Sequence, residues 1–420
     1  MSTVNKAIII GAGPAGLAAA LQLHRKNNID VTVYELRPRP SNIGGSIGIF
    51  PNGLRLLHRL GLYDALLARG AIVDTFHIHS LHQGNIGSMD ISAWAKKKSG
   101  FGFMRIIRRD LLEVLFDAIH GEEIPVHFDK RLVSIEEGAS SVTVTFSDGS
   151  NDTADILIGC DGIHSSVRRL HVDPATKPEY SGIAGSGAIV STVGLPEMLR
   201  KEANIIPTTA GVIAMFPCSA AGDQLYWFLS RETPIPYSES GNERDGWEVR
   251  RQQEMEVFKS TIREMTKPAQ GEWRGVLAAL VDRTDVIGFY PVFRLPLGGK
   301  WYTSRTILLG DAGHAMQPHA GQGTSMALED AFLLSRVLKE KDWSLEHAFA
   351  RYEAIRRPRI NELYQLAAKN GRRRKATGSW ALWVGENVMW ARLGLYRILG
   401  LESWGLGQTH LVYDIDEVEL

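Results

Sequence analysis

Short, largely apolar runs alternate with helical patterns toward both ends of the chain. The runs have the length of buried strands and lie at residues 7–10, 31–34, 156–158 and 306–309. Between or after them, apolar side chains recur every three or four positions, as in amphipathic helices, at residues 17–25, 51–69, 108–119 and 326–338. This alternation predicts an α/β fold with a Rossmann-like domain.

The middle of the chain follows a different pattern. Residues 71–98 alternate in polarity around glycines, which predicts a hairpin-rich insertion. From residue 180 onward we expect mainly strands, at 183–193, 211–217, 224–230 and 286–293, with one helix at 247–265. A tryptophan-rich helical stretch follows Pro358.

These patterns predict three interleaved regions. We expect a discontinuous Rossmann-like domain over residues 1–75, 101–178 and 288–358. A mainly β-sheet substrate domain would comprise residues 76–100 and 179–287, and C-terminal helices would occupy 359–420.

Composition narrows the class of function. Lys+Arg and Asp+Glu each number 47, and this zero net charge argues against nucleic acid or an anionic membrane surface as the main partner. Two cysteines, Cys160 and Cys218, exclude a disulfide scaffold and favour a reducing, cytoplasmic location. The spacing of Cys and His predicts no metal site.

A glycine motif follows the first predicted strand. Gly11, Gly13 and Gly16 form G-x-G-x-x-G, in which the glycines permit a tight turn, a bound pyrophosphate and close packing of the next helix. Glu35 ends the second strand, where a carboxylate accepts hydrogen bonds from a ribose. The motif predicts an adenosine cofactor of the FAD or NAD type and does not separate the two.

The most informative segment is residues 310–331. A carboxylate, Asp311, follows the predicted strand at 306–309, and a loop rich in glycine leads to the helix at 326–338. Ordinary connections have about two to six residues, whereas this one has about fifteen. The segment therefore predicts a site where backbone amides and a helix N-terminus bind an anion.

Three ordered motifs carry a family resemblance. They are G-x-G-x-x-G at 11–16, Asp161-Gly162 within Cys160–Arg168, and Gly310-Asp311; Arg108 also matches an R-x-D-L helix start. With these motifs the chain resembles the FAD-dependent aromatic hydroxylases, the class A flavoprotein monooxygenases that include para-hydroxybenzoate and salicylate hydroxylases. The resemblance covers most of residues 5–360 and makes the Rossmann-like region an FAD-binding domain.

The resemblance implies a cofactor site. Glu35 would bind the adenosine ribose, Arg108 would contact FAD, Asp311 would hold its ribityl or pyrophosphate part, and Asp161 would serve both FAD and NAD(P)H. Residues 44–47 would approach the isoalloxazine, and 318–323 would line the oxygen-reaction pocket. The full implied set is Gly11, Gly13, Ala15, Gly16, Glu35, Arg37, Gly45, Ser46, Arg108, Asp161, Asp311, Pro318, Gly321, Gly323 and Thr324. Family members often carry Asn where this chain has Ser325.

The resemblance also implies a reaction. FAD would be tightly bound, NAD(P)H would bind transiently, and oxygen from O₂ would pass through a flavin C4a-hydroperoxide to an aromatic, phenolic or polyketide-like small molecule. Such a phenol needs a base or proton relay. The candidates are His319, beside Pro318, and His79, Tyr226 and Arg231 in the sheet domain, whereas His314 matches a position with a structural role.

Several alternatives stay open. A protein of this fold could instead be a reductase or dehydrogenase acting on an apolar substrate, or an FAD-binding protein without turnover. The chain is expected to be a monomer or homodimer. The C-terminal tryptophans fit core packing first, then a dimer surface, a lid, or contact with a membrane surface.

Overall fold

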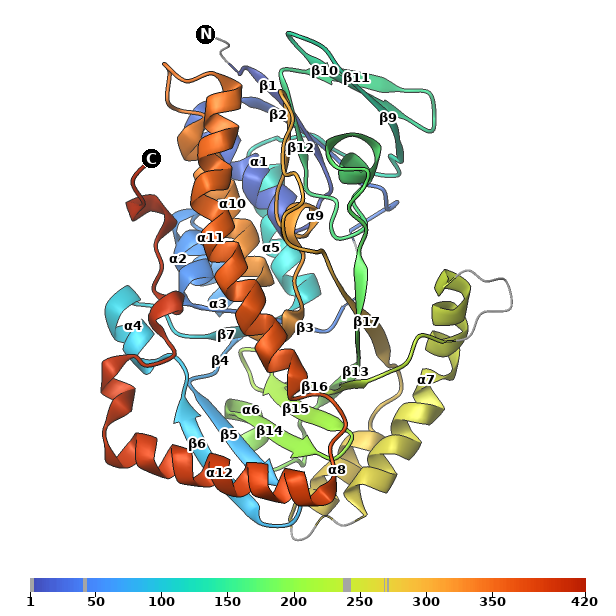
Figure 1. Ribbon diagram of the computed structural model, residues 1–420, viewed down its shortest axis with the longest axis vertical. Helices are drawn as coiled ribbons and strands as arrows, with labels where there is room; N and C mark the ends of the chain where they lie inside the picture. The colour runs from blue at the N-terminus through green and yellow to red at the C-terminus, as the bar shows by residue number, and fades with distance from the viewer. Residues whose placement is uncertain (1–3, 41–43, 237–242, 268, 270–271) are drawn as a thin grey trace.

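A five-stranded parallel sheet forms the frame of the α/β domain. The computed structural model describes residues 4–40, 44–236, 243–267, 269 and 272–420. The sheet has the order β18-β12-β1-β2-β8, and Figure 1 labels β12, β1 and β2. These strands span Thr306–Leu308, Ile156–Gly159, Lys6–Ile10, Asp30–Tyr34 and Val126–His127. The four predicted apolar runs are therefore four adjacent strands of one sheet, which confirms the Rossmann-like fold.

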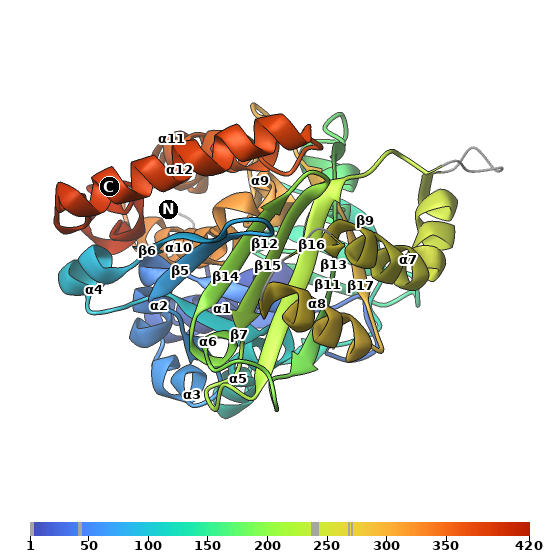
Figure 2. The same cartoon turned by 90° about the horizontal axis from the view of Figure 1, so that it is seen from below.

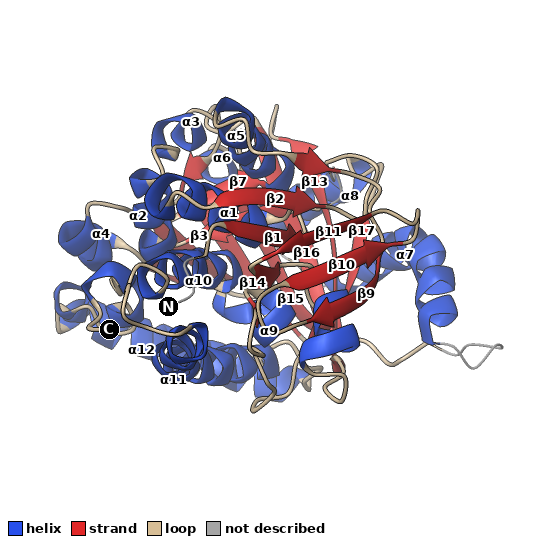
Figure 3. Ribbon diagram, turned by 90° about the horizontal axis from the view of Figure 1, so that it is seen from above, coloured by secondary structure: helices blue, strands red, loops and turns tan. Residues whose placement is uncertain are grey.

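Both faces of this sheet are buried. Ala7 and Ile9 belong to the core shared with the helices, whereas Ile8 and Ile10 belong to the core under a second, antiparallel sheet (Figure 3). Burial on both faces explains why β1 is apolar without alternation. The helices are α1 (Pro14–Asn27), α5 (Arg108–Gly121) and α10 (Gly323–Val337), and the second sheet has the order β11-β10-β9 (Asn151–Ala154, Val142–Phe146, Leu132–Glu137).

The substrate region is a seven-stranded sheet assembled from distant segments. Its order is β17-β13-β16-β15-β14-β5-β6. All neighbours pair antiparallel except β14 and β5, which pair parallel and join the insertion at 71–98 to the rest of the sheet. The strands are Gly288–Arg294, Glu179–Ser191, Gln224–Glu232, Gly211–Pro217, Ala203–Thr208, Thr75–Ser80 and Gly84–Asp90.

The two faces of the large sheet differ in what covers them. One face, with Trp227 and Leu229, packs under α7 (Glu243–Thr266) and α8 (Glu272–Asp282) (Figure 2). The other face carries Phe76, Phe216 and Phe228 and packs against residues from the α/β side. A small sheet, β3-β7-β4 (Ser46–Ile49, Met104–Ile107, Ala71–Ile72), lies at this junction.

Three expectations about helices need correction. The helix predicted at 51–69 is two helices, α2 (Pro51–Arg59) and α3 (Tyr63–Leu67), because Gly61 takes a left-handed φ of 75°. The helix α8 was not predicted. The chain is helical after Pro358 as expected, but the helix begins earlier, because this residue lies inside α11 (Leu345–Arg372).

The C-terminal region contains α12 (Ser379–Ile398), and the tryptophans in and just after this helix contradict the expected core packing. Trp380, Trp383, Trp390 and Trp404 are all exposed. Over the described part of the chain, no helix has both the length and the apolarity to cross a membrane. The remaining short elements are α4 (Ala93–Ser99), α6 (Met198–Lys201), α9 (Asp311–His314), η1 (Arg168–Val172), η2 (Pro318–Ala320), η3 (Leu401–Trp404), η4 (Thr409–Leu411) and η5 (Ile415–Glu417).

Candidate active site

The glycine turn after β1 has the shape that a dinucleotide requires. Gly11 has φ 108°, and a Cβ there would lie 2.4 Å from the carbonyl oxygen of Cys160. A Cβ on Gly16 would lie 2.0 Å from the carbonyl oxygen of Gly11. By contrast, a Cβ on Gly13 would meet no described atom within 4 Å. Gly13 also precedes α1 without a side-chain cap, so its helix N-terminus can receive an anion.

Glu35 stabilises this turn through hydrogen bonds to the backbone. Its two carboxylate oxygens accept hydrogen bonds from the backbone amides of Ala12 and Arg37, each at 2.9 Å. These bonds hold the carboxylate beside the glycine turn. Since each carboxylate oxygen can accept more than one hydrogen bond, Glu35 keeps capacity for a ribose hydroxyl.

Arg108 and Asp311 come from distant segments of the chain, and the charge of each shifts the pKa of the other. Burial lowers the pKa of Arg108, as does repulsion from Arg37, while Asp311 and Glu35 act in the opposite sense. Burial raises the pKa of Asp311, and attraction to His314 and Arg108 offsets this only in part. Both Arg108 and Asp311 nevertheless remain solvent-accessible. The charge of each residue therefore influences the other at the carboxyl edge of the parallel sheet.

Asp161 closes a second turn at the same sheet edge. Its Oδ2 accepts hydrogen bonds from the amides of Ser166 (2.6 Å) and Val167 (3.2 Å). Its Oδ1 is buried and finds no hydrogen-bond partner in the described part of the chain, and burial raises the pKa of this carboxyl. Arg168 donates to the carbonyl oxygen of Ala312 at 2.7 Å and thereby ties this turn to the segment at 310–314.

A buried network of charges fixes the 310–331 segment. Asp330 accepts hydrogen bonds from the Gly310 amide (2.8 Å) and from Arg356 Nε (2.7 Å), and it lies 2.7 Å from His314 Nε2. Burial raises the pKa of Asp330, but His314 and Arg356 outweigh it and hold the pKa well below its usual range. His314 therefore has the structural environment that the resemblance implied.

Glu329 extends this network to the start of α10. It accepts hydrogen bonds from Arg356 (2.5 Å), from Arg359 (2.8 Å) and from Asn52 (2.8 Å). Asn52 also donates to Gln322 at 3.0 Å, the residue that precedes α10. The network was missed in the sequence because its partners are between 16 and 277 residues apart and meet only in the fold.

The loop before α10 presents backbone toward open space. A Cβ on Gly323 would meet no described atom within 4 Å, and Gln322 provides no side-chain cap for the helix. Gly321 takes a left-handed φ of 66°. Ser325 does not share this open side, because it is buried with its Oγ 2.5 Å from where a Cβ of Gly53 would lie.

An arginine from β7 lies among aromatic side chains beside this region. The Arg105 guanidinium is 4.4 Å from the ring centre of Phe216 and 5.7 Å from that of Tyr226. Arg105 donates to the hydroxyl (2.8 Å) and the carbonyl oxygen (3.1 Å) of Ser46. No carboxylate among the described residues pairs with it, and burial lowers its pKa to about 10. Sequence reasoning missed Arg105, although a lone charge in an apolar strand was a usable signal.

Tyr226 reaches the loop predicted to approach the flavin. A Cβ on Gly45 would lie 2.3 Å from Tyr226 Cε2, so the tyrosine ring lies directly on this glycine. Burial raises the pKa of Tyr226, which keeps its hydroxyl protonated. The structure thus brings together Gly45, Ser46, Arg105 and Tyr226.

The other catalytic candidates lie elsewhere. His79 bonds to Asn204 (2.9 Å) and packs on Trp273 of α8 at 4.5 Å between ring centres, on the sheet face away from Tyr226. Burial lowers the pKa of His319 to about 3, with Arg374 adding repulsion, so His319 is a weak base. Arg231 pairs with Glu254 at 3.2 Å.

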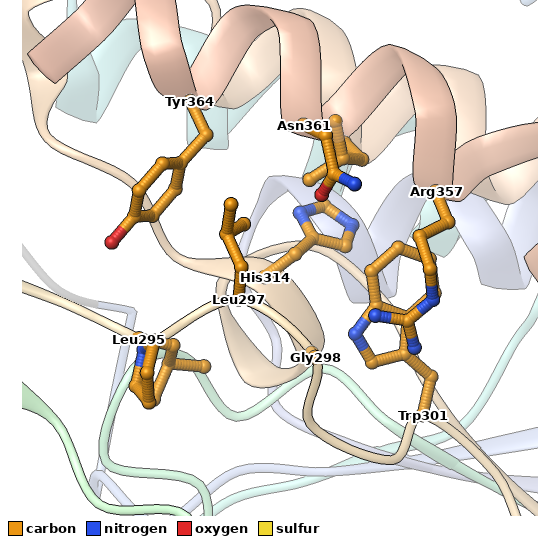
Figure 4. A pocket seen from close by; sticks show the side chains of 11 residues that line it. Leu295, Leu297, Gly298, Trp301, His314, Arg357, Asn361 and Tyr364 are labelled. Atoms are coloured by element: carbon orange, nitrogen blue, oxygen red, sulfur yellow. The ribbon is translucent and has the colours of Figure 1, made fainter.

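A separate pocket lies between α11 and residues 295–301. Figure 4 shows Trp301, His314, Arg357 and Tyr364 along its wall. Arg357 stacks on Trp301, with the guanidinium 4.3 Å from the ring centre. None of the predicted cofactor residues lines this pocket, so it is distinct from the predicted cofactor site at the sheet edge.

Comparisons with known proteins agree with this arrangement. The family described as "FAD binding domain" matches residues 5–269 and 298–367. The 6-hydroxynicotinate 3-monooxygenase of Pseudomonas fluorescens is 30% identical over 88% of this chain and 92% of its own. The 3-amino-4-hydroxybenzoate 2-monooxygenase PtnB3 of Streptomyces platensis is 28% identical over 86% of this chain and 87% of its own.

A solved structure shares the fold over nearly the whole length. Klebsiella pneumoniae HpxO, complexed with FAD and uric acid, matches 96% of this chain and 97% of its own with a TM-score of 0.79 and 24% identity. The shared fold comprises both the α/β domain and the large sheet.

The charge network generates a prediction about stability. Arg356→Met would leave Glu329 and Asp330 buried without their shared partner, which costs about 3–5 kcal/mol. We expect urea denaturation to show this loss in the free energy of unfolding. Arg351→Met on the same helix, where Arg351 donates only to the carbonyl oxygen of Glu419, is expected to cost less than about 1 kcal/mol. Equal losses in the two variants would contradict the central role of the network.

Proposed function

The chain belongs to the FAD-binding-domain family of FAD-dependent monooxygenases, and from this premise we propose that it hydroxylates a small phenolic aromatic that carries an oxyanion. The protein is an FAD-dependent monooxygenase. Use of NAD(P)H as the transient reductant and the class of substrate belong to the proposal.

The residues at the carboxyl edge of the parallel sheet fit FAD. Gly13 and the N-terminus of α1 would receive the pyrophosphate, and Glu35 would bind the adenosine ribose. Arg108 and Asp311 would hold the part between pyrophosphate and flavin. Three observations support this assignment of FAD. A Cβ at Gly13 would meet no described atom within 4 Å, and the charges of Arg108 and Asp311 are accessible. The helices α1 and α10 also begin without a side-chain cap.

Arg105 is the observation that carries the substrate proposal. A guanidinium surrounded by Phe216 and Tyr226, and paired with no described carboxylate, lacks the counter-charge that a buried cation needs. A bound oxyanion would supply that charge, and the aromatic rings would pack against a planar ring. Ser46 orients the guanidinium from the strand that follows Gly45.

The proposed mechanism assigns distinct tasks to cofactor and protein. When bound, FAD would accept a hydride and activate O₂. Arg105 would pair with the carboxylate of the substrate and so hold the phenolic ring in place beside the flavin. Tyr226 stays protonated and can donate a hydrogen bond, while the aromatic side chains around Phe216 exclude water.

The first test is turnover. We expect hydroxybenzoates and hydroxypyridine carboxylates to stimulate oxidation of NADH or NADPH by the holoenzyme, with equal O₂ uptake and a product that gains one oxygen. Nicotinamide oxidation without O₂ uptake would instead indicate a reductase of this fold. If none of these compounds stimulates oxidation of NADH or NADPH, the result would favour an FAD-binding protein without turnover.

The cofactor assignment predicts a loss of FAD from a single carboxylate variant. Asp311→Ala should be purified largely without FAD, because the variant loses the charge beside Arg108. Absorbance of the flavin per mole of protein measures this. Asp285→Ala, which removes an exposed carboxylate outside the site, is the control and should keep its FAD. Full FAD content in Asp311→Ala would refute the assignment.

The substrate assignment predicts a selective change in affinity. Arg105→Gln should lose a charge-assisted hydrogen bond of about 1.5–3 kcal/mol, which raises KM for an anionic substrate about 10- to 150-fold. An uncharged amide analogue of that substrate should show little change. Arg109→Gln, which removes an exposed arginine paired with Asp110 and Glu113, should leave both KM values unaltered. A uniform change for acid and amide would contradict recognition of charge by Arg105.

A further inference from the structure

The helix α12 turns its apolar side chains outward. Of its twenty residues, all of them described, only Glu386 is buried. Trp380, Trp390 and Ile398 are 76%, 63% and 83% exposed. A surface helix of a globular protein normally buries its apolar stripe and exposes its charges, whereas α12 exposes its apolar side chains and buries its one carboxylate. Figures 1 and 2 show α12 on the outside of the molecule, alongside β5 and β6.

Specific contacts fix this orientation. Glu386 Oε2 accepts a hydrogen bond from Ser80 Oγ at 2.8 Å. Gly87 of β6 lies against Leu393, since a Cβ on Gly87 would be 2.9 Å from Leu393 Cδ1. Glu386 and Leu393 therefore lie against the sheet, whereas Trp380, Val388, Leu395 and Ile398 lie on the opposite half of the helix. Trp383 and Trp390 flank the contact, three and four positions from Glu386, and are also exposed. We call these exposed apolar residues together the α12 outer face; they are Trp380, Trp383, Val388, Trp390, Leu395 and Ile398.

The charged side chains of α12 are mainly cationic on its exposed side. The one carboxylate of the helix, Glu386, lies against the sheet. Arg392 and Arg397 are exposed, and Arg397 also donates a hydrogen bond to Ser88 Oγ of β6 at 2.9 Å. Exposed basic residues also precede the helix and occur on α4, which packs against η3 directly after α12; they are Arg372, Arg373, Lys375, Lys96, Lys97 and Lys98.

We propose that the α12 outer face lies in the interfacial layer of a bilayer that contains anionic lipid, with the helix parallel to the membrane surface. Tryptophan favours this layer because its ring is apolar and its N–H polar. The flanking arginines and lysines would contact anionic headgroups. The zero net charge of the chain does not oppose this, because salt confines such attraction to about 8 Å.

A second copy of the chain fits the same face less well. In a twofold dimer built on this face, the cations that border it would approach their own copies, and like charges repel. An anionic lipid surface would remove the apolar side chains from water and would also pair the cations with negatively charged headgroups. The proposal concerns residues apart from the predicted cofactor residues and stands independently of the proposed function.

The test is vesicle flotation with the full-length holoenzyme. We expect it to float with vesicles of equal parts phosphatidylcholine and phosphatidylserine, and to bind less as salt rises. Replacing Trp380, Trp383 and Trp390 together by Gln should weaken binding about tenfold or more, because that much apolar surface no longer leaves water. FAD content and turnover of a soluble substrate should stay unaltered in this variant.

Matched variants separate the two contributions. Arg392→Gln should weaken binding to the mixed vesicles and leave any binding to pure phosphatidylcholine unchanged. Val193→Gln with Val286→Gln removes exposed apolar surface outside α12 and should bind as the parent does. Failure of the parent protein to float at low salt would overturn the proposal. A dimer that the triple tryptophan variant dissociates, measured by light scattering, would also overturn it, since the face would then join two copies.

Discussion

The pairing of Arg356 with Asp330 and Glu329 is the interaction on which the site depends. All three side chains are fully buried, so each charge is stable only while its partner stays in place. Through Asp330 the pair holds the amide of Gly310 and the ring of His314, and through Glu329 and Asn52 it reaches Gln322. Both ends of the loop between β18 and α10 are thus anchored in one charged core, which leaves Asp311 and Gly323 accessible between them.

The second constraint is the common edge of the parallel strands. Asp161 follows β12, the glycine turn follows β1, Glu35 follows β2 and Asp311 follows β18. Parallel strands end at the same edge, so residues from four distant segments come together without any local signal between them. The large sheet then brings Tyr226 onto Gly45, where the cofactor side meets the side that carries Arg105.

Local patterns predicted the frame, and only the fold could show the rest. The strands β1, β2, β12 and β18 were found because each is a short apolar run buried on both faces. The first turn was found because its glycines follow a short apolar strand at the G-x-G-x-x-G spacing, and Gly11 and Gly16 have no room for a Cβ. His79 could not be placed, because the face it occupies depends on α8, a helix that the sequence did not predict. Arg356 was missed for a related reason, since a buried arginine is recognised only by the acids that meet it.

The account rests on an oxyanion bound at Arg105 beside the flavin. A crystal structure of the holoenzyme with a hydroxybenzoate tests this most directly. The account predicts one oxyanion of the ligand within hydrogen-bond distance of the Arg105 guanidinium, with its ring between Tyr226 and the flavin. A ligand bound with Arg105 unpaired, or in the pocket beside Trp301 and Arg357, would contradict it.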